Sequence, residues 1–228
     1  MSYVVDLVAE PGVGLAVVHL GAGALTLARY VAATRPGSRQ RAVEVSEEVA
    51  AAVREQLPLG RGVKVPVQVA DARAALNRMR AGSTDLVVLD VFAGARTPAH
   101  LTTQEMVAEV QRVLVPGGSV VANVADGPGL AFARGQVATY LSVFPHVVAM
   151  AEPGVWRGRR FGNVVLAASA VPLPVPGLTR RCAGDPVPAR VVSGAELRRL
   201  VGGAAVVTDA SAVDSPAPPP EVFGRRRR

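Results

Sequence analysis

Valine-rich apolar runs alternate with longer amphipathic segments between residues 15 and 170. The runs are mostly continuous and seldom alternate with polar residues, which is typical of strands covered on both faces of a sheet. The segments between them carry helical patterns. We therefore expect strands at 15–20, 41–45, 64–69, 85–90, 118–123, 146–150 and 163–168, and helices at 24–34, 46–57, 71–81, 103–114 and 128–142.

Capping signals mark the ends of two of these helices. Ser46, followed by glutamates, has the composition of an N-cap and an acidic first turn. Thr102 or Thr103 begins the fourth helix, and Pro116-Gly117-Gly118 is expected to stop it. Because strands and helices alternate, the strands should be parallel and joined by right-handed crossovers.

The connection between the last two strands breaks this rhythm. Residues 151–162 contain Pro153, Gly154, Gly158 and Gly162 and are too few for a crossover helix with its two loops. The last strand should therefore turn back antiparallel. The expected fold is α/β and Rossmann-like, a seven-stranded, mostly parallel sheet with the last strand antiparallel, which is the layout of methyltransferases.

Two glycines one residue apart follow the first strand, in His19-Leu20-Gly21-Ala22-Gly23. Glycine lets the chain turn sharply out of a strand and approach a ligand closely. Glu44 closes the second strand, where an acidic side chain can take both hydroxyls of a ribose. The pattern predicts a nucleoside site, although a tight turn beside a surface glutamate would look similar.

Acidic residues follow the second to fifth strands: Glu44, Asp71, Asp90 and Asp126. Ligands of doubly wound sheets bind outside the carboxyl ends of the strands. Asp71 and Asp126 could also serve simply as helix N-caps. Together, four carboxylates on one rim suit a ligand with ribose hydroxyls, an exocyclic amine and a positive charge.

Charge and composition limit the other classes of function. The net charge is +7, but four of these charges are Arg225–Arg228, and Lys64 is the only lysine. Aromatic residues make up 4% of the chain, so base-stacking surfaces are poorly supplied and we expect no nucleic-acid partner. The three histidines are scattered and Cys182 is the single cysteine, so we expect no metal site and no internal disulfide.

Length and hydropathy point to one sizeable domain with an appendage. No apolar run approaches the roughly 20 residues of a membrane span, and no signal peptide is evident, so we expect a cytoplasmic protein without a membrane partner. Residues 1–170 should form the nucleoside-binding domain. Residues 171–228 read as a Pro-rich, poorly regular C-terminal extension with a short helix at 194–201 and a basic tail.

With these motifs placed, residues 15–170 resemble the spermidine synthase (polyamine aminopropyltransferase) family and, more broadly, class I S-adenosylmethionine-dependent methyltransferases. The resemblance implies a cofactor site formed by Gly21, Ala22, Gly23, Glu44, Asp71, Ala72 and Asp90. Glu44 would hold the ribose, Asp71 with Ala72 would lie near the adenine amine, and Asp90 would be the catalytic residue. The implied co-substrate is decarboxylated S-adenosylmethionine or S-adenosylmethionine, without a metal.

Three features depart from the family pattern. Ala24 stands where the glycine loop normally carries an aspartate. The Asp-Ser-Ser-Asp catalytic segment reads Asp90-Val91-Phe92-Ala93, so alanine replaces the usual acid/base. The family's N-terminal β-domain, which supplies substrate contacts and a dimer interface, is expected to be lacking because the first strand begins near residue 15.

These observations favour a spermidine-synthase-like transferase that moves an aminopropyl group to a small-molecule amine. One alternative is a methyltransferase acting on another small acceptor. The other is a nucleoside-binding protein that has lost catalysis, which would be consistent with Ala24 and Ala93. A homodimer is compatible with each hypothesis.

Overall fold

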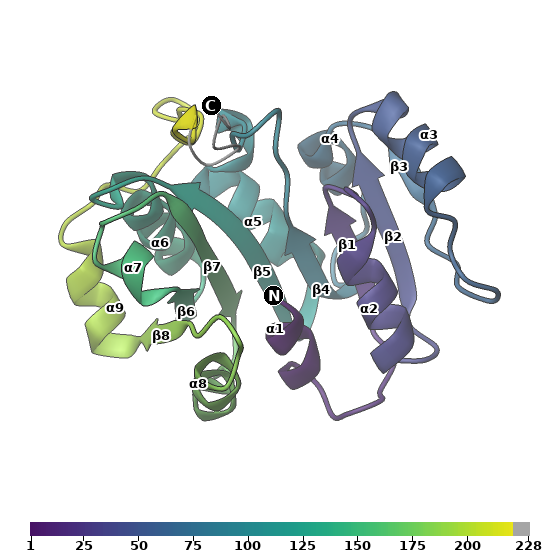
Figure 1. Cartoon of the computed structure of the whole chain (residues 1–228), viewed down its shortest axis with the longest axis horizontal. Coiled ribbons are helices and arrows are strands. Elements are labelled where there is room, and N and C mark those ends of the chain that lie inside the picture. Colours follow the sequence, from purple (N-terminus) through teal and green to yellow (C-terminus); the bar gives the residue numbers. More distant parts are fainter. Residues whose placement is uncertain (221–228) are drawn as a thin grey trace, which may run out of the picture.

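One eight-stranded sheet forms the centre of the computed structural model, which describes residues 1–220 (Figure 1). Its strand order is β3-β2-β1-β4-β5-β7-β6-β8. The strands are β1 (Ala16–Leu20), β2 (Arg39–Glu44), β3 (Val67–Val69), β4 (Thr84–Leu89), β5 (Leu114–Asp126), β6 (His146–Ala151), β7 (Gly162–Ser169) and β8 (Arg190–Ser193).

The predicted reversal of the strand after residues 151–162 is confirmed. β7 pairs antiparallel with both β5 and β6, whereas β1 to β5 pair parallel with one another. The connection before β7 holds only the single-turn helix α7 (Pro153–Trp156). The α/β methyltransferase-type fold is therefore as predicted, but the sheet has eight strands, because β8 adds antiparallel to the edge strand β6.

Helices cover both faces of the sheet (Figure 1). One apolar cluster joins the sheet to α1, α2 and α8, and a larger one joins it to α4, α5, α6 and α9. The helices are α1 (Ser2–Leu7), α2 (Thr26–Thr34), α3 (Glu47–Gln56), α4 (Ala72–Asn77), α5 (Gln104–Val113), α6 (Ala131–Val143), α8 (Val175–Ala183) and α9 (Gly194–Val201).

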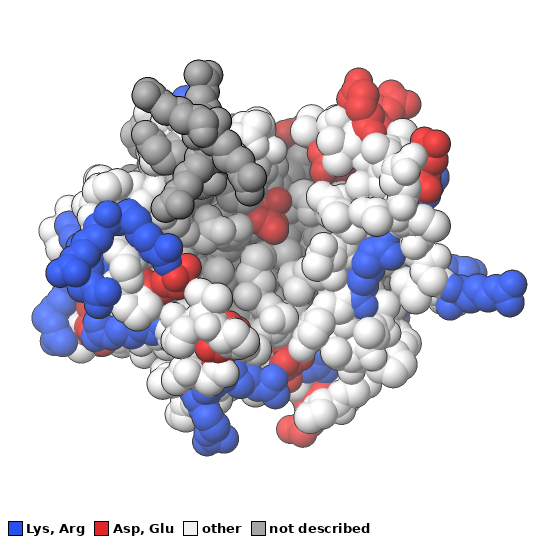
Figure 2. Space-filling view, viewed as in Figure 1, with Lys and Arg blue, Asp and Glu red and all other residues white. Residues whose placement is uncertain are grey.

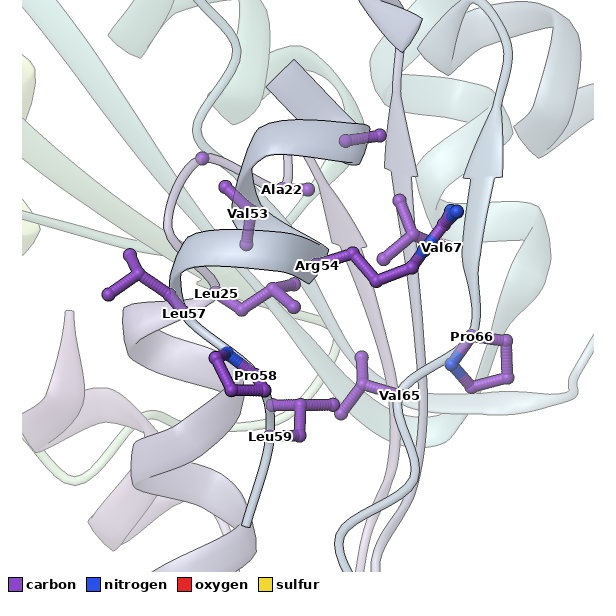
Figure 3. A pocket seen from close by; sticks show the side chains of 12 residues that line it. Ala22, Leu25, Val53, Arg54, Leu57, Pro58, Leu59, Val65, Pro66 and Val67 are labelled. Atoms are coloured by element: carbon purple, nitrogen blue, oxygen red, sulfur yellow. The ribbon is translucent and has the colours of Figure 1, made fainter. Parts of the chain in front are cut away.

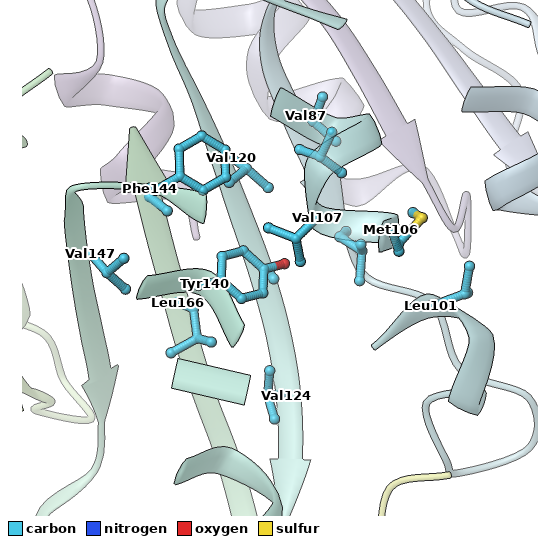
Figure 4. Packing of buried hydrophobic residues seen from close by; sticks show 14 of the residues in the cluster. Val87, Leu101, Met106, Val107, Val120, Val124, Tyr140, Phe144, Val147 and Leu166 are labelled. Atoms are coloured by element: carbon cyan, nitrogen blue, oxygen red, sulfur yellow. The ribbon is translucent and has the colours of Figure 1, made fainter. Parts of the chain in front are cut away.

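The larger cluster explains the continuous apolar runs. Val87 and Val120 from neighbouring strands meet Val107 of α5 and Tyr140 of α6 (Figure 4). Burial of these side chains supplies the main driving force for packing α5 and α6 on the sheet. The Tyr140 hydroxyl lies inside this cluster, and its burial raises the pKa of Tyr140.

The predicted N-caps of α3 and α5 are confirmed, but the segment before the paired part of β5 differs from the prediction. The Ser46 hydroxyl accepts the Val49 amide at 3.1 Å, and the Thr103 hydroxyl accepts the Met106 amide at 3.2 Å. The expected stop at 116–118 is wrong, because β5 begins already at Leu114. Residues 115–118 instead form a bulge between two paired positions of β5, and Gly117 supplies its positive φ of 82°.

The segment after residue 170 is more regular than its proline content predicts. α8 packs against α1, and β8 extends the sheet, so the expectation of poorly regular chain is corrected here. The prolines at 172, 174, 186 and 188 flank these elements without interrupting them. Helix α9 matches the expected 194–201, while the basic tail at 225–228 lies outside the described residues.

No helix within residues 1–220 combines the length and apolar character needed to cross a bilayer.

His19 is buried in β1, as expected for a core residue, and its ring nitrogen lies 2.8 Å from the Gln40 amide oxygen. Burial lowers the pKa of His19 below its ordinary 6.5, partly opposed by the Gln40 contact. As the pH falls below about 6.5, the unfolded chain takes up this proton and the folded chain does not. We expect the free energy of unfolding to decrease over this range until the pKa of the folded state is reached.

Urea unfolding at about pH 7.5 and about pH 5.5 tests this expectation. The decrease should be smaller in His19→Gln, which keeps a polar group beside Gln40 but cannot take the proton. Equal decreases in the two proteins would show that His19 does not couple to folding.

Candidate functional site

The carboxyl ends of β1, β2, β3 and β4 surround a cavity of about 590 Å³. The strand order reverses between β1 and β4, which is where doubly wound sheets bind their ligands. Figure 2 shows this side of the molecule hollowed, with acidic side chains inside the hollow. The lining residues include Gly21, Gly23, Glu44, Asp71, Ala72, Asp90, Phe92, Ala93 and His100.

Gly21 allows the first strand to turn directly against the end of the fourth. Its φ is +87°, and a Cβ atom built there would lie 2.2 Å from the Asp90 carbonyl oxygen. Gly23 has a φ of +45° with open space around it. The glycine at 21 is thus required by close packing of two chain segments, and the one at 23 by backbone conformation alone.

This difference gives a matched pair of substitutions. Gly21→Ala should lower the free energy of unfolding by roughly 2–5 kcal/mol, because the left-handed conformation and the clash with backbone both oppose it. Gly23→Ala should cost only about 1–2 kcal/mol. Denaturant unfolding measures both, and similar losses for the two variants would contradict the packing argument.

Glu44 links the glycine loop to the start of α3. One carboxylate oxygen accepts the Ala22 amide at 3.1 Å and the other accepts the Ser46 amide at 3.2 Å. The side chain is half-buried and lines the cavity. An ionised carboxylate has about four acceptor positions, so two remain for a ligand after these backbone contacts.

Asp71 caps α4 and pairs with a histidine that the sequence did not single out. Its Oδ1 accepts the Ala74 amide at 2.9 Å, and its Oδ2 lies 2.7 Å from His100 Nε2. Burial acts to raise the pKa of Asp71, but the amide and His100 contacts outweigh it and lower the pKa. Asp71 is therefore both the N-cap that the sequence allowed and a charged wall of the cavity.

Asp90 is the exposed carboxylate at the end of β4. Its Oδ1 accepts a hydrogen bond of 2.9 Å from the side-chain amide of Asn123 on β5. Its backbone amide bonds Leu20, which holds the chain beside Gly21. Because Asp90 is exposed and lines the cavity, it can place negative charge next to a cationic ligand atom.

Asp126 does not join this group. It is buried, and its two carboxylate oxygens accept the amides of Gly127 at 2.7 Å and Ala133 at 2.8 Å. Burial raises the pKa of Asp126 in spite of these amides. The structure therefore brings together three of the four predicted strand-end acids, and Asp126 holds the start of α6 instead.

A second cavity of about 350 Å³ lies on the other side of the glycine loop, between α3 and the chain leading into β3 (Figure 3). Its lining is apolar except for Arg54, and Ala22 faces this side. It offers no carboxylate for a ribose. The cavity at the strand ends, which is lined by Glu44, Asp71 and Asp90, is therefore the candidate site.

Two contributors escaped the sequence patterns. His100 comes from the loop after β4 and Asn123 from the interior of β5, and both are recognisable only once β4 and β5 are adjacent. Among residues 1–220, no group of three or more His, Cys, Asp and Glu side chains has an arrangement that could hold a metal ion.

The chain is similar to known proteins of the methyltransferase fold. Residues 18–122 match the family described as a methyltransferase domain. A probable spermidine synthase from Corynebacterium glutamicum ATCC 13032 is 37% identical, with a TM-score of 0.80 over 86% of this chain and 72% of that chain. Human methyltransferase-like protein 13, solved in complex with SAH, is 18% identical with a TM-score of 0.59, covering 88% and 86%, and shows the fold alone.

A curated relative is the polyamine aminopropyltransferase of Vibrio vulnificus (strain CMCP6), 28% identical over 160 residues. The match covers 69% of this chain and 50% of the relative. The chain thus spans about half the length of this relative.

Proposed function

This chain belongs to the spermidine synthase-like family of proteins with the methyltransferase fold, and we propose that its acidic cavity binds the nucleoside of a sulfonium co-substrate. The observation that carries the proposal is the convergence of Glu44, Asp71 and Asp90 with Gly21 on one cavity. These residues lie at the ends of four different strands, and no single helix cap or turn would bring all of them to one cavity.

Each of the three carboxylates could contact a different part of the ligand in addition to its contacts within the protein. Glu44 is oriented by the Ala22 and Ser46 amides and would accept the two ribose hydroxyls. Asp71 would accept the exocyclic amine of adenine. Asp90 would face the sulfonium or the incoming amine, where its negative charge stabilises positive charge.

The preferred reaction is aminopropyl transfer from decarboxylated S-adenosylmethionine to a small amine. The amine nitrogen would form a bond to the carbon next to sulfur, the carbon–sulfur bond would break, and methylthioadenosine would leave. The amine must then lose a proton. The protein would contribute mainly by positioning the two reactants and by electrostatics.

The match of residues 18–122 to methyltransferase domains supports a second candidate, methyl transfer from S-adenosylmethionine to a small acceptor. Ala93 at the cavity wall supports a third, nucleoside binding without catalysis. The three differ in which ligand binds best and in whether product forms.

Thermal-shift measurements with decarboxylated S-adenosylmethionine, S-adenosylmethionine and methylthioadenosine test the proposal. A ligand at 100 times its Kd should stabilise the protein by about 2.7 kcal/mol, which is a readily measured shift in Tm. The largest shift with the decarboxylated compound would support the aminopropyl hypothesis, and the largest with S-adenosylmethionine would support methyl transfer. No shift with any of the three would refute the nucleoside site.

A further inference from the structure

The chain after α9 returns to the candidate site. Residues 207–215, here called the strap, run from α6 past the start of α5 to the loop at 91–103 that follows β4. The Val207 amide donates to the Thr139 hydroxyl at 2.9 Å, and the Val207 carbonyl accepts the Gln104 amide at 2.7 Å. Figure 1 shows the strap in yellow beside the loop that joins β4 to α5.

The end of the strap is bound to the middle of this loop. The Thr97 amide donates to the Ser215 hydroxyl at 2.8 Å, and the Ser215 amide donates to the Thr97 carbonyl at 3.0 Å. The Ala99 amide donates to Asp214 at 2.9 Å, and the Arg96 guanidinium donates to the Ser215 carbonyl at 2.6 Å. Ser215 is fully buried, which is unusual for a serine in a Pro-rich segment.

The middle of the strap reaches the cavity through two other residues. Both carboxylate oxygens of Asp209 accept hydrogen bonds from Arg73, at 2.7 and 2.8 Å. Arg73 also donates to the His100 carbonyl at 3.3 Å, and the His100 ring contacts Asp71 at 2.7 Å. The hydrogen bonds from Arg73, with a smaller one from Thr103, lower the pKa of Asp209 to about 2.

The loop held by the strap has little structure of its own. Its described backbone contacts include one isolated bridge between Ala93 and Arg96 and a short 3-10 turn, η1 (Ala99–Leu101). Holding such a loop in one conformation costs conformational entropy. Yet it supplies six lining residues of the cavity: Val91, Phe92, Ala93, Pro98, His100 and Leu101.

We propose that Asp209, Asp214 and Ser215 are positioning residues of the nucleoside site. Asp214 and Ser215 hold the 91–103 loop against the cavity before a ligand arrives. Asp209 acts through Arg73 and His100 to orient Asp71, and so sets how strongly the site prefers an adenine amine. The role of Asp209 rests on the function proposed above, whereas the role of Asp214 and Ser215 concerns the protein without a ligand.

Base discrimination tests the Asp209 contact chain. The probes are methylthioadenosine and methylthioinosine, which differ in the exocyclic group that Asp71 would meet. Asp209→Ala should reduce the ratio of their affinities, measured by calorimetry, by roughly 3–10-fold, the loss of about one net hydrogen bond. Asp209→Glu, which keeps the charge, should restore part of the ratio.

Asp185→Ala is the matched control. Asp185 is an aspartate that follows α8 and accepts a hydrogen bond from the Tyr3 hydroxyl. This substitution should leave the ratio unchanged. An unaltered ratio in Asp209→Ala, with the wild-type protein binding methylthioadenosine, would overturn the role of Asp209.

Hydrogen exchange without ligand tests the loop separately. In Asp214→Ala and in Ser215→Ala, the backbone amides of residues 91–103 should exchange faster than in the unmodified protein. The expected increase is roughly 2–10-fold for each hydrogen bond that is removed. Asp214→Asn keeps an acceptor for the Ala99 amide and should restore protection, while Ser83→Ala, remote in the loop before β4, should have no effect on this segment. Unchanged exchange in both strap variants would overturn the proposal, and this result is independent of whether any nucleoside binds.

Discussion

Aminopropyl transfer to putrescine should be weak or undetectable in the unmodified protein, and Ala93→Asp should raise its rate by roughly 10²–10⁴-fold. The amine must lose a proton on transfer, and a positioned base typically contributes this factor. Ala93 lines the cavity three residues after Asp90. The family resemblance implies that the usual acid/base would stand at this position. Asp126, which could have substituted, has both oxygens engaged by the amides of Gly127 and Ala133.

The measurement is formation of spermidine and methylthioadenosine from decarboxylated S-adenosylmethionine and putrescine, with binding of the co-substrate measured in parallel. Ala93→Asn, which adds a side chain of the same size without the carboxylate, is the matched control. Robust synthesis by the unmodified protein would show that the missing carboxylate is not needed. Binding without turnover in both the unmodified protein and Ala93→Asp would favour a nucleoside-binding role.

Glu44→Ala should weaken nucleoside binding at least tenfold. A hydrogen bond to a charged group contributes about 1.5–3 kcal/mol, and the ribose would lose two of them. The same substitution frees the Ala22 and Ser46 amides, so the glycine loop and the start of α3 lose their common acceptor. Loss of affinity is therefore expected to come from both direct contact and positioning.

Calorimetry with methylthioadenosine measures this effect, and denaturant unfolding checks that the fold is retained. Glu44→Gln keeps one oxygen acceptor and should lose less affinity than Glu44→Ala. Glu47→Ala, in the exposed first turn of α3, should bind like the unmodified protein. Unchanged affinity in Glu44→Ala would remove the ribose assignment.

The sheet could be predicted from the sequence because its strands are continuous apolar runs separated by helical segments of ordinary length. The reversal of β7 followed from the short connection before it. The bulge at 115–118 could not be predicted, because Pro-Gly-Gly is also a helix-stop signal and only the pairing with β4 decides between the two. β8 was missed because a four-residue strand among prolines has no distinctive periodicity.

The candidate site, too, could be predicted only in part from the sequence. Glu44, Asp71 and Asp90 could be placed on one rim because each directly follows a strand, and the structure puts them on one cavity. Their roles toward a ligand stay predictions. His100 and Asp209 carry no such positional signal, since they meet Asp71 and Arg73 across 29 and 136 residues of sequence.

The pairing of Thr97 with Ser215 spans 118 residues, which has a consequence for biosynthesis. At about 5–20 residues per second, a ribosome makes the loop at 91–103 roughly 6–24 s before the residues that bind it. During this interval the emerging β1, β2 and β4 can associate, while the 91–103 loop is not yet bound by the strap. A nascent chain should therefore be able to pair β1, β2 and β4 well before it acquires a binding-competent site.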